Sequence, residues 1–211
     1  FFDYDKDGWL DLYVCNYVFF DIVKNKKCYA KSSRRDYCGP SAFPPQKDRF
    51  YRNKGDGTFE DVTDKVLVDY KPGAGLGVIT IDANKDGWLD LFVCNDGMAN
   101  QLWINDKGKT FRDDALFAGT ALNMDGQAEA SMGVSCADFN RDGNEDLFLT
   151  HLMGETNTLY INNGQGLFED RTIAMGLSAK SFPYTAFGTG AVDYDNDGWA
   201  DLMIVCGAVR I

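Results

Sequence analysis

The nonapeptide DYDKDGWLD, residues 3–11, decides the fold because three close copies of it follow along the chain. The copies read DANKDGWLD (82–90), DFNRDGNED (138–146) and DYDNDGWAD (193–201). Their first residues are 3, 82, 138 and 193, so the period is about 55 residues and the first interval holds an insertion of about 24 residues. A regular period of this length indicates a repeat architecture.

Each nonapeptide leads into an apolar strand, and a second pair of short strands follows it. The first strands read DLYVCN (11–16), DLFVCN (90–95), DLFLTH (146–151) and DLMIVC (201–206). The second pairs lie in 49–63, 101–114 and 158–172, where Asn and Gly between the two halves predict hairpin turns. Four strands in every period of about 50 to 60 residues predict an all-β fold, a β-propeller of four-stranded blades.

We expect 1–211 to form a single propeller segment of about three and a half blades. The repeat units are about 1–72, 73–128, 129–183 and 184–211, with the insertion at 17–48, and the Gly- and Ala-rich stretch 114–129 is predicted to be a connection. The chain opens within a strand, with neither an initiator Met nor a signal peptide, so we expect a piece of a longer protein. Further blades or partner chains should cover its open edges.

The acidic nonapeptides carry side-chain oxygens at positions 1, 3, 5 and 9, and Gly at position 6 permits a sharp turn. The oxygen-bearing residues are Asp3, Asp5, Asp7 and Asp11; Asp82, Asn84, Asp86 and Asp90; Asp138, Asn140, Asp142 and Asp146; Asp193, Asp195, Asp197 and Asp201. Position 7 should add its backbone carbonyl, from Trp9, Trp88, Asn144 and Trp199. Since Ca²⁺ takes about 6 to 8 oxygen ligands, these loops predict about four calcium sites.

Two other interpretations of the loops are weaker. Asp, Asn and Gly are common in plain polar turns, but such turns have no need of four crowded carboxylates in nine residues. An EF-hand requires a bidentate carboxylate at position 12, where this chain has apolar residues: Val14, Val93, Leu149 and Ile204. The flanking residues also have strand rather than helix patterns, so a helix-opening calcium sensor is disfavoured.

Charge and composition agree with cation binding. The chain has 32 acidic and 21 basic residues, a net charge of −11, which argues against nucleic acid as the main partner. Its single His leaves little scope for a His-based metal centre. No stretch approaches the roughly 18 apolar residues of a membrane helix, and a 45% apolar composition is ample for a core.

The combination of GxGxxxxD, DxDxDGxxDL and LYxNxGxGxFxDVT resembles the FG-GAP (VCBS) repeats of integrin α-type propellers. The segments VCNYV, YCGPSAFPPQKDRFYRN, GQAEASMGV and GETNTLYINN, in this order, resemble more closely the ASPIC/UnbV class and the cartilage acidic proteins. This resemblance implies a secreted protein with a seven-bladed ring and Ca²⁺ loops between the first two strands of a blade. The further blades and the carboxy-terminal ASPIC domain of that class are not in this sequence.

The insertion has its own chemistry. Cys28 and Cys38 lie in it, and a disulfide closing this short loop would contribute about 3 kcal/mol in the chain-entropy account. The other cysteines, predicted to be buried thiols, are Cys15, Cys94, Cys136 and Cys206. Six basic residues follow one another without an acidic one: Lys24, Lys26, Lys27, Lys31, Arg34 and Arg35. They indicate either a solvated loop or a docking surface for an acidic partner or glycan.

These observations favour a non-catalytic, calcium-binding propeller module that acts as a recognition or structural scaffold outside the cell, at its surface or in the periplasm. No motif pairs a nucleophile with a base, and His151 has no evident catalytic partner, so we interpret it as structural. A propeller-type enzyme acting on glycans is the alternative, and a structural subunit of a larger extracellular assembly is a third possibility. The expected partners are Ca²⁺ and a protein or glycan.

Overall fold

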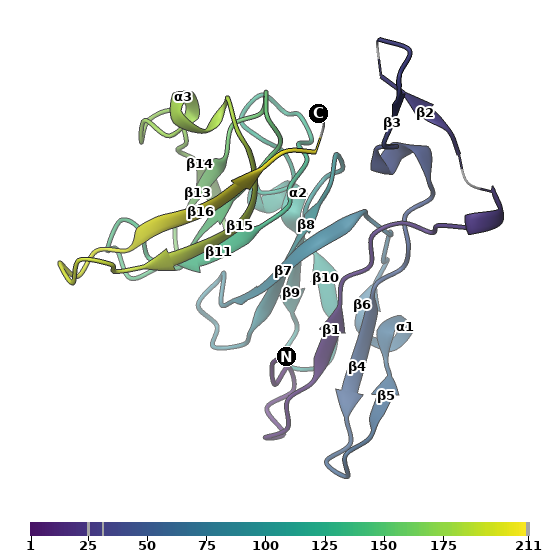
Figure 1. Ribbon diagram of the computed structural model, residues 1–211. Coiled ribbons are helices and arrows are strands. Elements are labelled where there is room, and N and C mark those ends of the chain that lie inside the picture. The colour runs from purple at the N-terminus through teal and green to yellow at the C-terminus, as the bar shows by residue number, and fades with distance from the viewer. Residues whose placement is uncertain (25, 31, 210–211) are drawn as a thin grey trace.

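The computed structural model describes residues 1–24, 26–30 and 32–209 of the chain, and its architecture is all-β (Figure 1). Four sheets, antiparallel apart from one added edge strand, lie one beside the next, as blades of a propeller do, and the helices are single turns. The prediction of four-stranded propeller blades is thereby confirmed. No helix in the described part of the chain is long and apolar enough to span a membrane.

The second blade contains the full set of strands. It follows chain order, each strand antiparallel to the one before it: β7 (Gly75–Ile81), β8 (Asp90–Asn95), β9 (Gln101–Asn105) and β10 (Phe111–Asp113). A fifth strand, β6 (Leu67–Val68), pairs in parallel with β10 at the outer edge. This strand belongs to the first repeat unit in sequence. Backbone hydrogen bonds therefore join the first two repeat units, in addition to side-chain packing.

The other blades repeat this plan to different extents. The third blade has four strands: β11 (Val134–Ala137), β12 (Asp146–Leu149), β13 (Thr158–Asn162) and β14 (Phe168–Asp170). The first blade has three, β1 (Leu12–Val14), β4 (Arg49–Asn53) and β5 (Phe59–Asp61), and its opening strand is reduced to one bridge between Phe2 and Asp11. The last sheet is half a blade, β15 (Thr185–Val192) and β16 (Asp201–Gly207).

The core lies between adjacent blades. One cluster joins the first two blades around aromatic rings: Phe50 and Phe111 have centroids 5.4 Å apart, and Trp103 is fully buried beside them. A second cluster joins blades two and three around Phe92, Leu147 and Tyr160. Because the faces of the sheets carry the apolar residues, each blade is stabilised by its neighbours.

Single helical turns follow the fourth strands. They are α1 (Thr63–Val66), α2 (Ala115–Ala118) and α3 (Ser178–Ser181). The stretch 114–129, predicted to be a connection, therefore begins with one helical turn, which Gly119 ends in the left-handed conformation at φ 83°. Four residues of helix are too short to alter the all-β architecture.

The half blade presents an open apolar face. Phe187, Met203 and Val205 are 38%, 57% and 57% exposed, whereas β8, the strand of blade two that corresponds to β16, is buried along its whole length. Apolar faces of this kind are covered in folded proteins by further protein.

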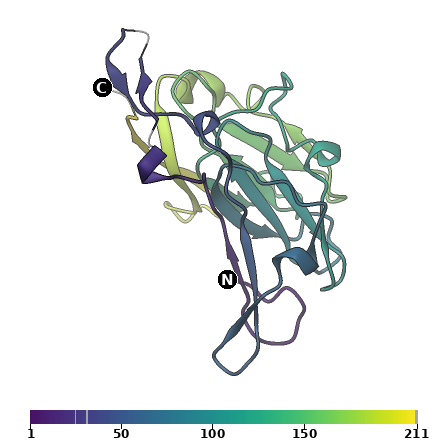
Figure 2. The same ribbon diagram turned by 90° about the vertical axis from the view of Figure 1, so that its right-hand side faces the viewer.

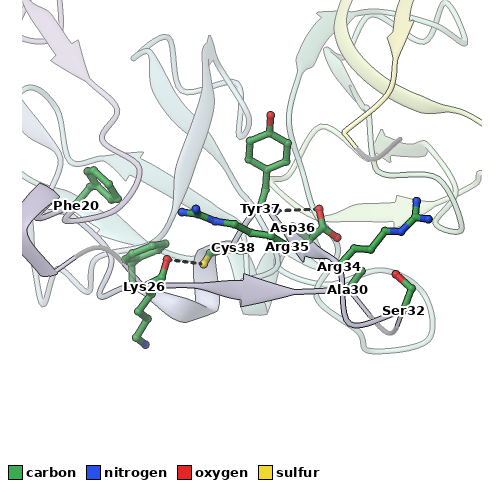
Figure 3. Close-up of a pocket in the computed structure, with 10 residues that line it drawn as sticks. Phe20, Lys26, Ala30, Ser32, Arg34, Arg35, Asp36, Tyr37 and Cys38 are labelled. Carbon is green, nitrogen blue, oxygen red and sulfur yellow. Dashed lines mark hydrogen bonds between the residues drawn. The ribbon is translucent and has the colours of Figure 1, made fainter.

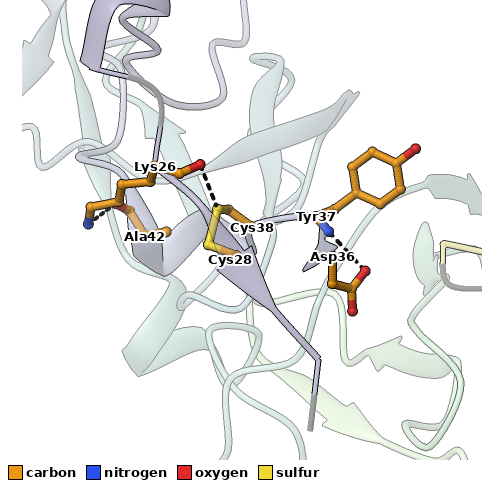
Figure 4. Close-up of a disulfide and its surroundings, with 6 residues drawn as sticks. All are labelled: Lys26, Cys28, Asp36, Tyr37, Cys38 and Ala42. Carbon is orange, nitrogen blue, oxygen red and sulfur yellow. Dashed lines mark hydrogen bonds between the residues drawn. A yellow bond between two sulfur atoms is a disulfide. The ribbon is translucent and has the colours of Figure 1, made fainter. Parts of the chain in front are cut away.

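The insertion forms a small hairpin that projects away from the blades in both views (Figures 1 and 2). Its elements are η1 (Ile22–Lys24), β2 (Cys28–Tyr29), β3 (Arg35–Asp36) and η2 (Pro40–Ala42). The predicted Cys28–Cys38 disulfide is confirmed, with the two Cα atoms 5.2 Å apart (Figure 4). The remaining cysteines are free thiols, but only Cys94 is fully buried and Cys206 is exposed, because its sheet lacks a neighbour on that face.

Candidate metal sites and the basic insertion

The four acidic loops occupy equivalent places, each joining the first two strands of its blade. Loop two, for example, begins after β7 ends at Ile81 and ends where β8 begins at Asp90. In loop one, the bridge between Phe2 and Asp11 replaces the strand pair. The repeated topology places the loops at corresponding ends of adjacent sheets (Figure 1).

Hydrogen bonds from backbone to carboxylate hold all four loops in one conformation. In loop two, Asp82 accepts the N–H groups of Asp86 at 3.1 Å and Gly87 at 2.9 Å, and Asp86 accepts that of Trp88 at 2.9 Å. The other loops make the same three bonds. Gly87 has a φ of 82°, as the sharp turn requires. The loops are therefore pre-shaped by their own backbone.

Position 4 has a conformation that the sequence did not indicate. Its residue is left-handed in every loop, with φ values of 57°, 57°, 59° and 60° for Lys6, Lys85, Arg141 and Asn196. Asn tolerates this region, but Lys and Arg rarely adopt it. Only Asn196 is a residue type that would predict a left-handed conformation from sequence. The left-handed conformation of Lys6, Lys85 and Arg141 is imposed by the turn of the whole loop.

Positions 1, 3 and 5 come together at the centre of the loop. In loops one and four a carboxylate oxygen from each lies within 4.8 Å of the others, in the triads Asp3, Asp5, Asp7 and Asp193, Asp195, Asp197. In loop one, Oδ1 of Asp5 is buried without a hydrogen-bond partner among the described residues. Such an oxygen is costly unless something binds it, so this donor set fits a hard divalent cation.

Loops two and three carry an amide at position 3. The carbonyl oxygens of Asn84 and Asn140 accept the N–H of position 5, at 3.1 and 3.0 Å, and their amide groups donate to the position-5 carboxylate. These amides thus occupy the position of Asp5 and Asp195 in loops one and four, and loops two and three have one negative charge fewer at the predicted ligand positions.

Position 9 has a structural role in addition to the predicted one. Asp90 is fully buried, and its two oxygens accept the N–H groups of Ala83 at 3.0 Å and Asn105 at 2.8 Å. Asp11 and Asp146 make the equivalent pair of bonds, and Asp201 makes the first of them. Burial raises the pKa of Asp90 to about 7. This carboxylate therefore clamps the loop to the third strand; its role as a metal ligand stays a prediction.

The position-7 side chains contact the neighbouring loop. The Lys6 ammonium lies 4.2 Å from the ring centroid of Trp88, and the Arg141 guanidinium lies 3.8 Å from that of Trp199. Trp9 and Trp199 are 52% and 46% exposed, so these two rings lie at the rim. Packing between blades, which we would expect of Trp at this position, is wrong for them. Cation–π contacts link loop one to loop two and loop three to loop four, with position 4 of one loop facing position 7 of the next.

One further residue enters a loop from a distant part of the chain. In β4, the Arg52 Nε donates to Asp5 Oδ2 at 2.7 Å, and its Nη2 donates to Asp7 Oδ2 at 2.8 Å. The sequence pattern did not predict this ion pair, because 45 residues separate Arg52 from Asp7.

His151 belongs to a buried hydrogen-bond network. Its Nε2 lies 3.1 Å from Ser131 Oγ and 3.7 Å from Glu129 Oε2, and burial lowers its pKa to about 4. A catalytic triad needs the carboxylate on the opposite ring nitrogen from the hydroxyl, whereas here both face Nε2. Ser131 is also buried. The arrangement favours the structural interpretation of this histidine.

The hairpin of the insertion frames a hollow of about 1100 Å³ (Figure 3). Its lining residues are Phe20, Lys26, Ala30, Ser32, Arg34, Arg35, Asp36, Tyr37, Cys38 and Phe43. Arg34 and Arg35 extend in opposite directions from the hairpin, and Tyr37 is 80% exposed. Lys31, the remaining predicted member of the basic run in this hairpin, lies outside the described residues.

Comparison with known proteins identifies the repeat. The profile of the FG-GAP-like repeat matches residues 37–93, 82–149 and 138–204, which together cover most of the chain. The chain belongs to the FG-GAP-like repeat family. The second and third matches run from one acidic loop through the next, and the first begins in the insertion and ends just after loop two, so the repeat includes the loops and strands that follow them.

The chain is also similar to part of several longer proteins. It is 29% identical over 169 residues to cartilage acidic protein 1 of Homo sapiens and 28% identical over 200 residues to that of Mus musculus, alignments that cover 74% and 92% of this chain. They cover 24% and 27% of those proteins, so the chain spans about a quarter of its relatives' length. The resemblance to the ASPIC/UnbV class stays a prediction.

A solved structure of an Agrocybe aegerita lectin that recognises non-reducing terminal N-acetylglucosamine also aligns with the FG-GAP-like chain. The alignment has a TM-score of 0.38 and 21% identity, and it covers 76% of this chain and 41% of that one. A likeness at this level carries no functional argument.

Proposed function

We propose that this chain is a calcium-stabilised, non-catalytic propeller module that serves recognition outside the cell. The observation that carries the proposal is the grouping of three carboxylates in loop one, of which Asp5 has a buried oxygen without a hydrogen-bond partner, in a loop shape that occurs four times. Close carboxylates repel one another, and a divalent cation removes this repulsion. Ca²⁺ suits the donor set better than Mg²⁺, which is smaller and retains its water.

An extracellular location agrees with this function. The Cys28–Cys38 disulfide suits an oxidising compartment, and weak calcium sites are useful where calcium is abundant. The matched relatives are named cartilage acidic proteins, which agrees with a place in the extracellular matrix. Further blades or partner chains would cover the apolar face at Phe187 and Val205.

Calcium titration of the metal-free protein tests the proposal directly. We expect four equivalents to bind with Kd values on the order of 10⁻⁴–10⁻³ M, as in other extracellular modules, because four loops present similar donor sets. Isothermal calorimetry measures stoichiometry and affinity together, with Mg²⁺ as the control ion. Absence of heat on adding Ca²⁺ to chelator-treated protein would refute the calcium function.

We further propose that the hairpin of the insertion docks an anionic partner. Tyr37, 80% exposed, lines the hollow with Arg34 and Arg35, and Tyr29, 61% exposed, is the strand partner of Arg35. Arg and aromatic residues are enriched at binding surfaces. The rest of the chain is acidic, since the net charge is −11 despite this basic segment. A separated basic patch on an acidic protein selects negatively charged partners.

Retention on immobilised heparin tests for an anionic glycan, and binding of poly-glutamate tests for an acidic protein. We expect the intact protein to be retained at low salt and released as the salt concentration rises, because surface charges are screened. The variant with Arg34→Gln and Arg35→Gln should elute much earlier. Arg112→Gln with Arg171→Gln is the matched control, since these exposed arginines pair locally with acidic residues. Flow-through of the intact protein on both probes would rule out this docking surface.

A further inference from the structure

Arg52 distinguishes the first acidic loop from the others. Its guanidinium binds the outer oxygens of the carboxylates at positions 3 and 5, while Oδ1 of Asp5 stays unpartnered. Throughout the described part of the chain, these are the only ion pairs that involve a carboxylate of an acidic loop. The side chains of Asp5 and Asp7 are 14% and 28% exposed, so the contact is partly shielded from water.

The equivalent residues of the next two blades are apolar. The third strands read RFYRN, QLWIN and TLYIN, and the final Asn of each donates to the backbone carbonyl before position 9 and gives its N–H to the position-9 carboxylate. These shared bonds align Arg52 with Ile104 and Ile161. Loops two and three, which have Ile there, carry Asn84 and Asn140 at position 3.

The charges of the loops then match. Loop one has four carboxylates at the predicted ligand positions and one guanidinium, which leaves three net negative charges (4 − 1 = 3). At the same ligand positions, loops two and three have three carboxylates each, and none of these forms an ion pair among the described residues. In the first blade, the additional acid at position 3, Asp5, is thus accompanied by an additional base in the third strand, Arg52.

We propose that Arg52 is a built-in counter-ion that holds the first loop together without metal and lowers the affinity of this loop for Ca²⁺. The inference rests on the proposed calcium function. A guanidinium on Asp5 and Asp7 neutralises their repulsion in the metal-free state and then repels an incoming dication. The first loop should therefore keep its shape when calcium falls better than loop four, whose four carboxylates at the same positions form no ion pair among the described residues.

Calcium titration of the variant Arg52→Ile, made in the full-length protein, tests the proposal. This substitution introduces the residue that blades two and three have at the equivalent position. We expect one calcium site to become about tenfold tighter, which corresponds to the loss of a nearby positive charge. Without calcium, the melting temperature should fall, and the added Asp5→Asn should restore it by recreating the Asn–Ile pairing of loops two and three. Arg52→Gln, which keeps most of the side-chain stem, should show the same affinity change.

Arg49→Ile is the matched control. Arg49 lies on the same strand with the same 40% side-chain exposure, and it pairs with Asp61 away from the loop. Unchanged or weaker calcium binding in both Arg52 variants, with the other sites intact, would overturn the proposal. Failure of every loop to bind calcium would instead refute the calcium function, and the coupling of Arg52 with Asp5 in metal-free protein would still report whether the pair stabilises the loop.

Discussion

Removal of calcium is expected to lower the melting temperature of this protein by about 12 to 24 °C. At a calcium concentration about tenfold above Kd, one site contributes about 1.4 kcal/mol, so four sites contribute about 6 kcal/mol. For a chain of this size, 1 kcal/mol changes the melting temperature by about 2–4 °C. The effect is large because every blade has an acidic loop, and the triads of loops one and four hold carboxylate oxygens within 4.8 Å of one another.

Thermal unfolding in chelator, in calcium and in magnesium measures this effect. Calcium should raise the melting temperature progressively with concentration, as mass action requires, and magnesium should raise it much less. The control is the same series in high salt, which separates specific binding from general screening of an acidic chain. Equal melting temperatures in chelator and in millimolar calcium would contradict the prediction.

The sequence was sufficient for the parts of the fold that follow from local pattern. The repeated nonapeptide and the strands after it predicted the blades, and two cysteines in a loop with few apolar residues predicted the Cys28–Cys38 disulfide, all of which the structure confirms. These features depend on residues that are close in the sequence or recur at a fixed period. Strand periodicity and turn chemistry are readable at that range.

The features that the sequence did not reveal depend on contacts between distant segments. Arg52 reaches a loop 45 residues earlier, Lys6 reaches a ring in the next blade, and β6 pairs with a strand of the following repeat. Comparison of the third strands does show that Arg52 replaces Ile, but only the structure places this side chain on Asp5. Similarly, the double backbone contact of Asp90 follows from how the third strand docks.

The carboxylates at positions 5 and 9 of loop two have different structural roles, and substitutions can distinguish these roles. Asp86 is exposed; its Oδ1 accepts the backbone N–H of Trp88, and its Oδ2 accepts only the exposed side-chain amide of Asn84, at 3.3 Å. Asp90 is fully buried and uses both oxygens, for Ala83 and Asn105. An Asn side chain keeps one acceptor oxygen and replaces the other by a donor. It therefore preserves the one backbone bond of Asp86 but only one of the two buried backbone bonds of Asp90.

Asp90→Asn should destabilise the metal-free protein by about 1–3 kcal/mol, because one buried N–H loses its acceptor. Asp86→Asn, the matched control, should change metal-free stability by less than about 0.5 kcal/mol. In calcium titrations each variant should lose or weaken one site of four, since each removes a carboxylate from the same predicted ligand set. Denaturant unfolding in chelator together with calorimetry distinguishes the two roles. If the two variants have equal stability without metal, the clamp at position 9 contributes nothing, and this carboxylate serves the cation alone.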